Sequence, residues 1–403
     1  MTLHSRLILV ALLALGPFAH ASTWYVDGVH GSDTDDCTTR QTACKTIGHA
    51  ISLASSGDSI LVGPATYKEH LFIEFSLGIL GANAKTTIID GSSNGVPVQS
   101  FFRSADVTLS ELTIQNGYSQ IGGGGIENAG SLTLSSSIVT ENKAQAFCSE
   151  FGCSGGQGGG IYNSGTLTIN NSTLRGNEAL GSAFRIHAIF GAGGGVYNLG
   201  SLTVSNSTVS GNHALDGGSG GASGGGIVNG GALVVNNSTL TANYAESSKR
   251  SEGGGIYSTS TSPIISNNTF SGNSAALGGN IYGSMVLQNT IVAHSAAGGN
   301  CYGTMTSVGY NLSSDNTCNF SGPGDLNNTD PTLGPLQNNG GPTQTMALLP
   351  GSPAIDAGNP NGCTDGKGNH LTTDQRGAPR PDKHSGICDI GAYEFQSPSP
   401  TAR

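Results

Sequence analysis

Residues 158–177 read GGGIYNSGTLTINNSTLRGN, and the same order of residue types recurs along the chain. Leu167 and Ile169 alternate with polar residues, which is the period-two pattern of a strand with one buried face. Glycine and asparagine mark turns on both sides of it. One unit cannot bury its apolar face alone, whereas stacked units can. The stretch therefore predicts a repeat protein built from short strands.

Three apolar positions keep offsets of two and five residues from unit to unit. They are Val107, Leu109 and Ile114; Leu132, Leu134 and Val139; Leu167, Ile169 and Leu174; Leu202, Val204 and Val209; Leu233, Val235 and Leu240; Pro263, Ile265 and Phe270; and Met285, Leu287 and Val292. Because proline cannot donate to a sheet, the strand at Pro263 should be short or begin late.

The third positions lie 25, 35, 35, 31, 30 and 22 residues apart, so the connections between units vary in length. Twenty-two residues suit one coil of a three-sided solenoid, and a propeller blade would need about 40 to 50. We therefore predict an all-β fold, a right-handed parallel β-helix. It should have eight or nine coils and a length of roughly 40 Å at ~4.8 Å per coil.

Two columns of asparagine support this stacking. The first follows the third apolar position by three residues and contains Asn142, Asn177, Asn212, Asn243 and Asn273. The second contains Asn128, Asn163, Asn198 and Asn229. Asparagine tolerates the left-handed backbone of tight turns, and stacked asparagines can hydrogen-bond along a column. We expect both columns to be structural.

The composition argues against a nucleic-acid partner. The chain has 16 Lys and Arg against 26 Asp and Glu, a net charge of −10, and only 10% charged residues. Phosphate binding needs concentrated basic residues, which are absent from this sequence. The 64 glycines show no collagen period, and the patterned apolar positions argue against disorder.

The N-terminus predicts export. Arg6 precedes the apolar run Leu7 to Leu15, and Ala19-His20-Ala21 fits a cleavage site, so residues 1–21 are interpreted as a secretory signal peptide. The apolar run is too short to span a bilayer, and no later stretch is long enough. We expect a secreted protein at the outer cell surface or in the extracellular medium, with the periplasm as an alternative.

Eight cysteines fit an oxidising compartment. Their proximity in sequence suggests four local disulfides, although eight cysteines allow 105 pairings. The pairs are Cys37–Cys44, Cys148–Cys153, Cys301–Cys318 and Cys363–Cys388. Zinc is the alternative, but C-x-x-C spacing is absent and no histidines cluster near the cysteines.

The N-terminal region, 22–58, predicts a cap for the open end of the solenoid, and the coils should occupy 59–300. Apolar residues at helical spacing predict a helix within Cys44 to Ala54, with Thr46 as its N-cap. Strands are predicted at Trp24–Val26, Ser59–Val62, Leu71–Ile73, Leu77–Leu80 and Thr87–Ile89.

Several motifs resemble known families. Trp24-Tyr-Val-Asp-Gly, Cys44-Lys-Thr-Ile and Gly63-Pro-Ala-Thr-Tyr look like the cap and first coil of pectin-lyase-like β-helix proteins. The Gly-Gly-Gly-Ile and Gly-Asn repeats are similar to those of polymorphic outer membrane proteins. These resemblances imply export and a parallel β-helix.

The C-terminal segment, 301–395, resembles the choice-of-anchor Q domain, and 396–403 form a short polar tail. The resemblance rests on Asp330-Pro-Thr-Leu-Gly-Pro, Asn339-Gly-Gly-Pro-Thr, Leu349-Pro-Gly-Ser-Pro-Ala-Ile-Asp-Ala-Gly, Asp374-Gln-Arg-Gly and Cys388-Asp-Ile-Gly-Ala-Tyr-Glu-Phe. It implies an exported bacterial protein of the cell surface.

Enzyme chemistry has little support in the coils. A lyase of this fold needs clustered acidic calcium ligands and a basic residue, and a glycosidase needs two carboxylates about 5 to 9.5 Å apart. Neither recurs at coil spacing. Asn328-Thr-Asp330 resembles one polygalacturonase motif, but its partner motifs are absent and Pro331 suggests a turn. We predict no catalytic residues, with a divergent calcium-dependent polysaccharide lyase or glycoside hydrolase as the alternative.

Calcium could bind at two acidic loops, although no cofactor is required by this interpretation. Asp33, Asp35 and Asp36 crowd one loop and offer oxygen ligands, unless they simply form a solvated turn beside Cys37. Asp365-Gly-Lys-Gly-Asn369 is a weaker candidate.

The variable connections are the predicted binding face, because they should leave the helix on one side. They cover 143–157, 178–192, 213–223 and 244–252 and carry aromatic and basic residues of the kind that anchor a binding patch. The candidates are Phe147, Phe151, Phe184, Arg185, His187, Phe190, Tyr244, Lys249 and Arg250. These loops could instead fold onto one another. We predict an adhesin-like scaffold that binds a polysaccharide or a surface protein.

Overall fold

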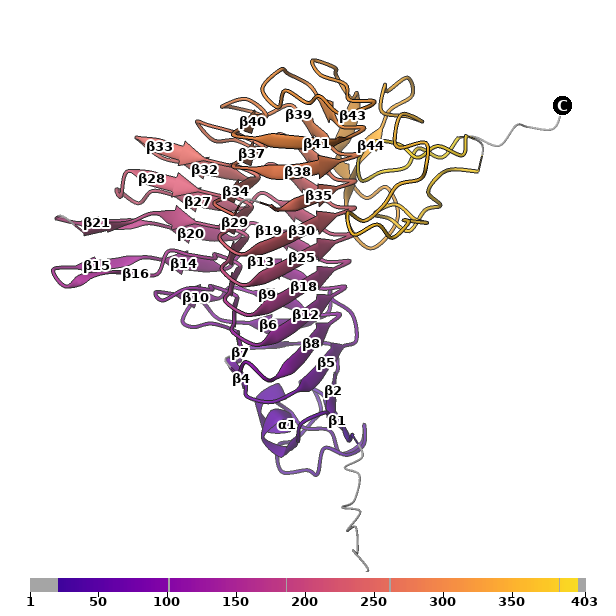
Figure 1. Ribbon diagram of the computed structural model, residues 1–403. Helices are drawn as coiled ribbons and strands as arrows, with labels where there is room; N and C mark the ends of the chain where they lie inside the picture. The colour runs from indigo at the N-terminus through magenta and orange to yellow at the C-terminus, as the bar shows by residue number, and fades with distance from the viewer. Residues whose placement is uncertain (1–20, 101, 186, 261, 384, 398–403) are drawn as a thin grey trace, which may run out of the picture.

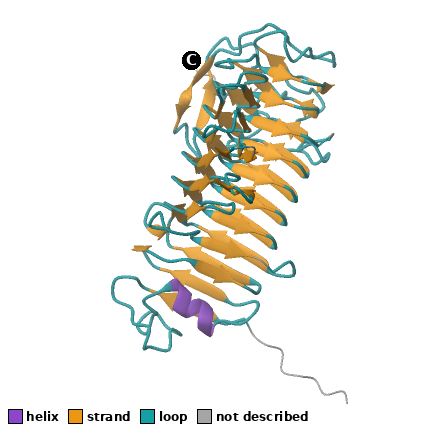
Figure 2. Ribbon diagram, turned by 90° about the vertical axis from the view of Figure 1, so that its left-hand side faces the viewer, coloured by secondary structure: helices purple, strands orange, loops and turns teal. Residues whose placement is uncertain are grey.

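The computed structural model describes residues 21–100, 102–185, 187–260, 262–383 and 385–397, so most of the predicted signal peptide lies outside the described residues. The chain winds into a right-handed parallel β-helix with three long sheets (Figures 1 and 2). The predicted fold class is confirmed. Nine coils contribute a strand to each of the three sheets, which agrees with the eight or nine expected.

The first sheet has eleven strands. They are β1 (Thr23–Val26), β2 (Ser59–Val62), β5 (Leu77–Gly81), β8 (Asp106–Ser110), β12 (Ser131–Ser135), β18 (Thr166–Asn170), β25 (Ser201–Ser205), β30 (Ala232–Asn236), β35 (Ile264–Ser266), β38 (Met285–Gln288) and β41 (Met305–Gly309). The first two apolar positions of each unit lie on this sheet, except Pro263, which precedes β35.

The second sheet has ten strands and carries the third apolar position. They are β3 (Ala65–Tyr67), β6 (Thr87–Asp90), β9 (Thr113–Gln115), β13 (Ile138–Thr140), β19 (Thr173–Arg175), β26 (Thr208–Ser210), β31 (Thr239–Thr241), β36 (Thr269–Ser271), β39 (Ile291–Ala293) and β42 (Leu312–Ser313).

The third sheet has nine short strands. They are β4 (Leu71–Ile73), β7 (Val98–Ser100), β11 (Ile126–Asn128), β17 (Ile161–Asn163), β24 (Val196–Asn198), β29 (Ile227–Asn229), β34 (Ile256–Ser258), β37 (Ile281–Tyr282) and β40 (Cys301–Tyr302).

The repeat positions pair in register and form the core. Leu167 of β18 pairs with Leu132 on one side and Leu202 on the other, and all three are buried. The unit with Pro263 confirms the expected defect, because β35 has three residues where β30 has five. Phe270 of the same unit is fully buried. Identical offsets therefore become continuous apolar columns along the solenoid axis.

Both predicted asparagine columns are hydrogen-bonded ladders. In the first, each Nδ2 donates to the Oδ1 of the next coil, from Asn142 to Asn177 at 3.0 Å and from Asn243 to Asn273 at 2.9 Å. This ladder continues through Asn280 and Asn300, which the sequence pattern missed. In the second, Asn128, Asn163, Asn198 and Asn229 are joined by contacts of 2.7 Å.

The expectation of a left-handed backbone for the first asparagine column was wrong. Its asparagines do not adopt the left-handed backbone conformation; a third set does. That set is Asn171, Asn206, Asn237, Asn267 and Asn289, with φ between 49° and 55°. These residues form the bend between the first and second sheets, where consecutive strands are separated by only two residues and the chain must turn sharply.

The N-terminal cap contains helix α1 (Ile47–Leu53), with Thr46 as N-cap as predicted. Its Oγ1 accepts from the backbone N–H of His49, and the Glu69 carboxylate accepts from the first two helical N–H groups at 2.9 and 2.7 Å. Ile47 and Ile51 are buried against the end of the solenoid, so the helix covers its open core. The five predicted N-terminal strands are present to within one residue at each end.

All four predicted disulfides form, so no cysteine is left for zinc. No helix in the described part of the chain is long and apolar enough to cross a membrane. Beyond β42 the chain runs back along the outside of the solenoid (Figure 1). This segment contains the antiparallel pair β43 (Leu333–Gln337) and β44 (Thr345–Leu348).

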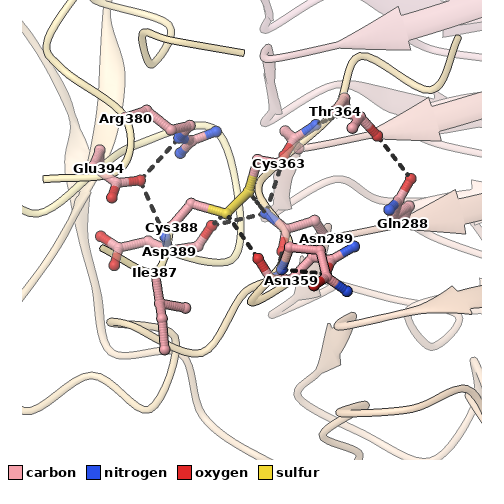
Figure 3. Close-up of a disulfide and its surroundings, with 12 residues drawn as sticks. Gln288, Asn289, Asn359, Cys363, Thr364, Arg380, Ile387, Cys388, Asp389 and Glu394 are labelled. Carbon is pink, nitrogen blue, oxygen red and sulfur yellow. Dashed lines mark hydrogen bonds and ion pairs between the residues drawn. A yellow bond between two sulfur atoms is a disulfide. The ribbon is translucent and has the colours of Figure 1, made fainter. Parts of the chain in front are cut away.

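The C-terminal segment is attached through the left-handed asparagines. Asn237 accepts from Arg380 and donates to the Thr373 carbonyl, and Asn289 donates to the Asp389 carbonyl at 2.8 Å. The disulfide Cys363–Cys388 lies directly beside Asn289 (Figure 3). One column of turn residues therefore holds a segment that lies about a hundred residues further along the chain.

Candidate functional site

The variable connections were expected to be loops. They instead form a fin of short strands on one side of the solenoid (Figure 1). A five-stranded sheet contains β10 (Tyr118–Ser119), β14 (Lys143–Gln145), β20 (Glu178–Leu180), β27 (His213–Leu215) and β32 (Tyr244–Glu246). A three-stranded sheet contains β23 (Gly191–Ala192), β28 (Gly221–Ser223) and β33 (Arg250–Glu252). We call these two sheets and their hairpins the fin. They lie on one side, as predicted.

Alanine explains why the fin can be thin. Ala214, Ala222, Ala245 and Ala275 form its small buried cluster. Because alanine has only a Cβ, the two narrow sheets can approach closely without large side chains between them. The possibility that the connections fold onto one another is thus realised in part, since they build a small core of their own.

Two hairpins extend the fin outward. They are β15 (Phe147–Ser149) with β16 (Gly152–Ser154), and β21 (Ser182–Phe184) with β22 (His187–Ile189). The disulfide Cys148–Cys153 joins a directly paired position in the first hairpin. His187 Nε2 lies 3.2 Å from the Glu150 carbonyl oxygen, so the hairpins contact each other.

Five of the predicted residues, His187 among them, occupy the hairpins. Phe147 and Phe151 are exposed, Phe151 to 91%, and the Arg185 guanidinium lies 5.3 Å from the centre of the Phe184 ring. The structure does not bring this group together with the predicted residues nearer the solenoid. The hairpin tips therefore form an outer apolar edge, while Ala188 and Ile189 of β22 reach the groove described below.

The remaining predicted residues lie closer to the coils. Tyr244 stacks on His213 at 3.9 Å between ring centres, on the five-stranded sheet. The Lys249 stem passes over Gly220. Arg250 forms an ion pair of 2.8 Å with Glu252, whose side chain is almost fully buried.

A column of tyrosines on the third sheet was missed at the sequence level. In five strands of this sheet the outward side chain is a tyrosine, and these residues are Tyr162, Tyr197, Tyr257, Tyr282 and Tyr302. Neighbouring rings stack at 5.6 Å for Tyr162 and Tyr197, and at 5.1 Å from Tyr257 to Tyr282 and from Tyr282 to Tyr302. The signal was present in the sequence, because tyrosine recurs directly after the apolar residue of the Gly-Gly-Gly-Ile motif.

The tyrosine column and the fin enclose a groove of about 410 Å³. Phe190 forms its wall on the fin and is the one predicted residue that lines it. Tyr197, Val228 and Tyr257 form its floor, and Gln157, Ser223 and Thr259 contribute polar side chains. A concave, mainly apolar surface with a few polar groups is the usual form of a ligand site.

Two carboxylates lie along the same face. Burial raises the pKa of Glu127, whose carboxylate accepts from Gln99 Nε2 at 3.3 Å. Further along, Glu252 and Arg250 interact with the Tyr282 hydroxyl, and burial together with Glu252 raises the pKa of that tyrosine. The charged groups therefore flank the groove and do not line it.

The separation of these carboxylates bears on catalysis. Glu127 precedes Glu252 by four coils, which is about 19 Å at the strand spacing of ~4.8 Å. Glycosidases place their two carboxylates about 5 to 9.5 Å apart. Glu127 and Glu252 cannot act as such a pair.

The acidic loops considered for calcium are engaged in hydrogen bonds within the chain. Asp33 accepts from the Lys45 and Thr46 backbone N–H groups and from the Thr46 hydroxyl. Asp365 accepts from the backbone of its own turn. Among the described residues, three potential ligand atoms come within 4.8 Å of one another only at Cys37, Cys44 and His49, where both sulfurs are in a disulfide.

Comparison with known proteins adds the following. No protein-family model matches the sequence, and no curated protein is significantly similar to it. Similar solved structures include a pectate lyase (TM-score 0.48, 14% identity, covering 93% of this chain and 97% of the lyase). A pectin methylesterase from Aspergillus niger has a TM-score of 0.37 at 13% identity, covering 74% and 89%. A rhamnogalacturonan lyase has a TM-score of 0.38 at 12% identity, covering 73% and 82%. At this distance the likeness says nothing about activity.

Proposed function

We propose that this protein is an exported, non-catalytic β-helix scaffold that binds a polysaccharide in the groove between the fin and the tyrosine column. The observation that carries the proposal is the alignment of outward tyrosines with a concave apolar wall along the solenoid axis. Aromatic rings offer large, rigid contact area with a polar hydroxyl at the edge. A glycan bound in the groove would contact several coils at once.

The arrangement of charge favours binding over cleavage. General acid–base chemistry on a sugar needs convergent titratable groups, and the carboxylates on this face lie four coils apart. The partners of Arg250 and Glu252 are each other and Tyr282, which neutralises both charges. The groove therefore offers contact area and hydrogen bonds without a reactive pair.

The proposed location is the outer cell surface or the extracellular medium. Four disulfides support an oxidising compartment. The N-terminal pattern of a secretory signal and the resemblance of 301–395 to the choice-of-anchor Q domain support the same location. The exposed hairpin residues Phe147, Phe151 and Phe184 would then face neighbouring molecules at the surface.

The test is retention of the purified chain on immobilised polysaccharides, compared with Tyr257→Ala and Tyr282→Ala variants. We expect each substitution to reduce retention at least several-fold without changing the unfolding temperature by more than a few degrees. Tyr25→Ala, at the N-terminal end of the first sheet, is the matched control. Retention unaffected by both substitutions in the tyrosine column would refute the proposal.

A calcium-dependent polysaccharide lyase remains the second candidate, and the contact of Arg250 and Tyr282 on the groove face favours it. An arginine can pair with the carboxylate of a uronic acid, and a tyrosine hydroxyl can donate a hydrogen bond to it. The same panel should be assayed for unsaturated products with and without calcium. Product formed at an enzymatic rate, and abolished by Arg250→Ala, would replace the scaffold with the lyase.

A further inference from the structure

The tyrosine column has one interruption. In the coil between Tyr197 and Tyr257 the outward position is Val228, which pairs in register with both. On either side of this coil the tyrosines are covered by another ring at 5.1 to 5.6 Å. The faces of Tyr197 and Tyr257 that point toward Val228 have no such neighbour, because valine has no ring to offer.

The missing ring leaves a slot of defined width. Two strand spacings separate Tyr197 from Tyr257, which is about 9.6 Å. A saturated six-membered ring that contacts an aromatic face on each side needs a gap of this order. Val228 is 7% exposed and forms the bottom of the slot, and Phe190 closes the side that faces the fin.

The backbone before the outward position has the same conformation in the three coils at the slot. Gly193, Gly224 and Gly253 each lie four residues before the outward position and have φ of 68°, 59° and 61°. The Phe190 ring lies over Gly221, where an added Cβ would come within 2.5 Å of it. Val228 therefore differs from Tyr197 and Tyr257 in its side chain, while the glycine turn before it has the same backbone conformation.

The lining of the slot is uncharged. Besides the aromatic and aliphatic residues it contains the Gln157 amide and the Ser223 and Thr259 hydroxyls, and no Asp, Glu, Lys or Arg. Amides and hydroxyls can exchange hydrogen bonds with sugar hydroxyls. A carboxylate placed here would lose hydration without gaining a cation, which is costly.

From this geometry we infer that the Val228 slot is a subsite for one neutral pyranose ring of the bound polysaccharide, held between Tyr197 and Tyr257. The inference rests on the proposed function and adds the class of sugar. The charged pair Arg250 and Glu252, which a uronic acid would need, lies in the coil of Tyr257 and outside the lining of the slot.

The decisive variant is Val228→Tyr, which completes the column and fills the slot with a ring that the neighbouring coils already accommodate. The matched control is Thr168→Tyr, which adds an outward tyrosine on the first sheet, away from the groove. Binding of xylohexaose, mannohexaose and hexagalacturonate should be measured by calorimetry, with the unfolding temperature of each variant as the test of folding.

We expect at least one neutral hexasaccharide to bind more tightly than hexagalacturonate, by tenfold or more. Val228→Tyr should weaken that binding at least tenfold with an unchanged unfolding temperature, and Thr168→Tyr should leave it unchanged. Binding that survives Val228→Tyr within twofold overturns the slot while the groove proposal stands. Preference for hexagalacturonate overturns the neutral class, and absence of any polysaccharide binding by the parent chain overturns both proposals.

Discussion

Arg380 and Glu394 form an ion pair of 2.9 Å whose two side chains are completely buried between the C-terminal segment and the solenoid. The Arg380 guanidinium also donates to the Gly391 carbonyl and to Asn237 Oδ1. Glu394 accepts from the backbone N–H groups of Asp382 and Asp389. Through Asn237 the pair ties the turn column of the solenoid to the last residues of the segment. Figure 3 shows the contact between Arg380 and Glu394.

Removal of one partner should be strongly destabilising. Glu394→Ala leaves a buried guanidinium without its counter-charge, which costs about 3 to 5 kcal/mol in buried pairs. We expect the free energy of unfolding in urea to fall by that amount. The double variant Arg380→Met with Glu394→Ala should recover part of the loss, because the orphaned charge is gone. A double variant no more stable than the single one would contradict this account.

Asp389 should contribute to the pH dependence of the stability of the folded chain. Burial, with the neighbouring Glu394 carboxylate, raises the pKa of Asp389 to about 7. The folded chain therefore holds a proton that the unfolded chain releases near pH 4, so this contribution is present at low pH and lost as pH rises toward 7. Carboxylates with lowered pKa, such as Asp58, act in the opposite direction.

The comparison with Asp389→Asn isolates this effect. The unfolding temperature of the parent chain minus that of the variant should decrease by a few degrees between pH 4 and pH 7 and then level off. Thermal unfolding followed by circular dichroism at each pH measures it. A difference that is flat, or that grows with pH, would show that the pKa of Asp389 is not raised in the folded chain.

The asparagine ladder should be a major source of stability at the interior coils. Asn212 Nδ2 donates to Asn243 Oδ1 and to the Leu174 carbonyl, and Asn212 Oδ1 accepts from Asn177. Asn212→Ala leaves buried donors and acceptors unpaired at about 1 to 3 kcal/mol each. We expect a loss of about 3 kcal/mol in unfolding free energy. Exposed Asn361→Ala is the control and should change little.

The disulfides should differ in their contribution. Cys363–Cys388 closes a separation of 25 residues and joins the C-terminal segment, whereas Cys148–Cys153 closes 5 residues in a hairpin of the fin. Loop-closure entropy predicts that replacing the first pair by serine costs about 3 kcal/mol and the second about 1 kcal/mol less. Urea unfolding of the two double variants tests the order. Equal losses would show that the hairpin unfolds together with the coils.

Local pattern was sufficient for much of this fold. The spacing of Leu167, Ile169 and Leu174 indicates two strands. The recurrence of those offsets predicts stacked coils. Thr46 and the apolar residues after it predict the capping helix. Cys37 pairs with Cys44 and Cys148 with Cys153 because the few intervening residues keep each pair close. These features depend on residues near one another in sequence, so the sequence alone determined them.

Contacts between distant segments were decided by the tertiary structure. Nothing around Asn237 or Asn289 indicates that their side chains would bind residues from 373 to 389, because that contact depends on the path of the returning chain. The fin was expected as loops because its strands are two or three residues long and pair only across coils. The slot at Val228 exists only when stacking places one coil between Tyr197 and Tyr257. Sequence spacing determines the coil, and the register between coils decides which side chains meet.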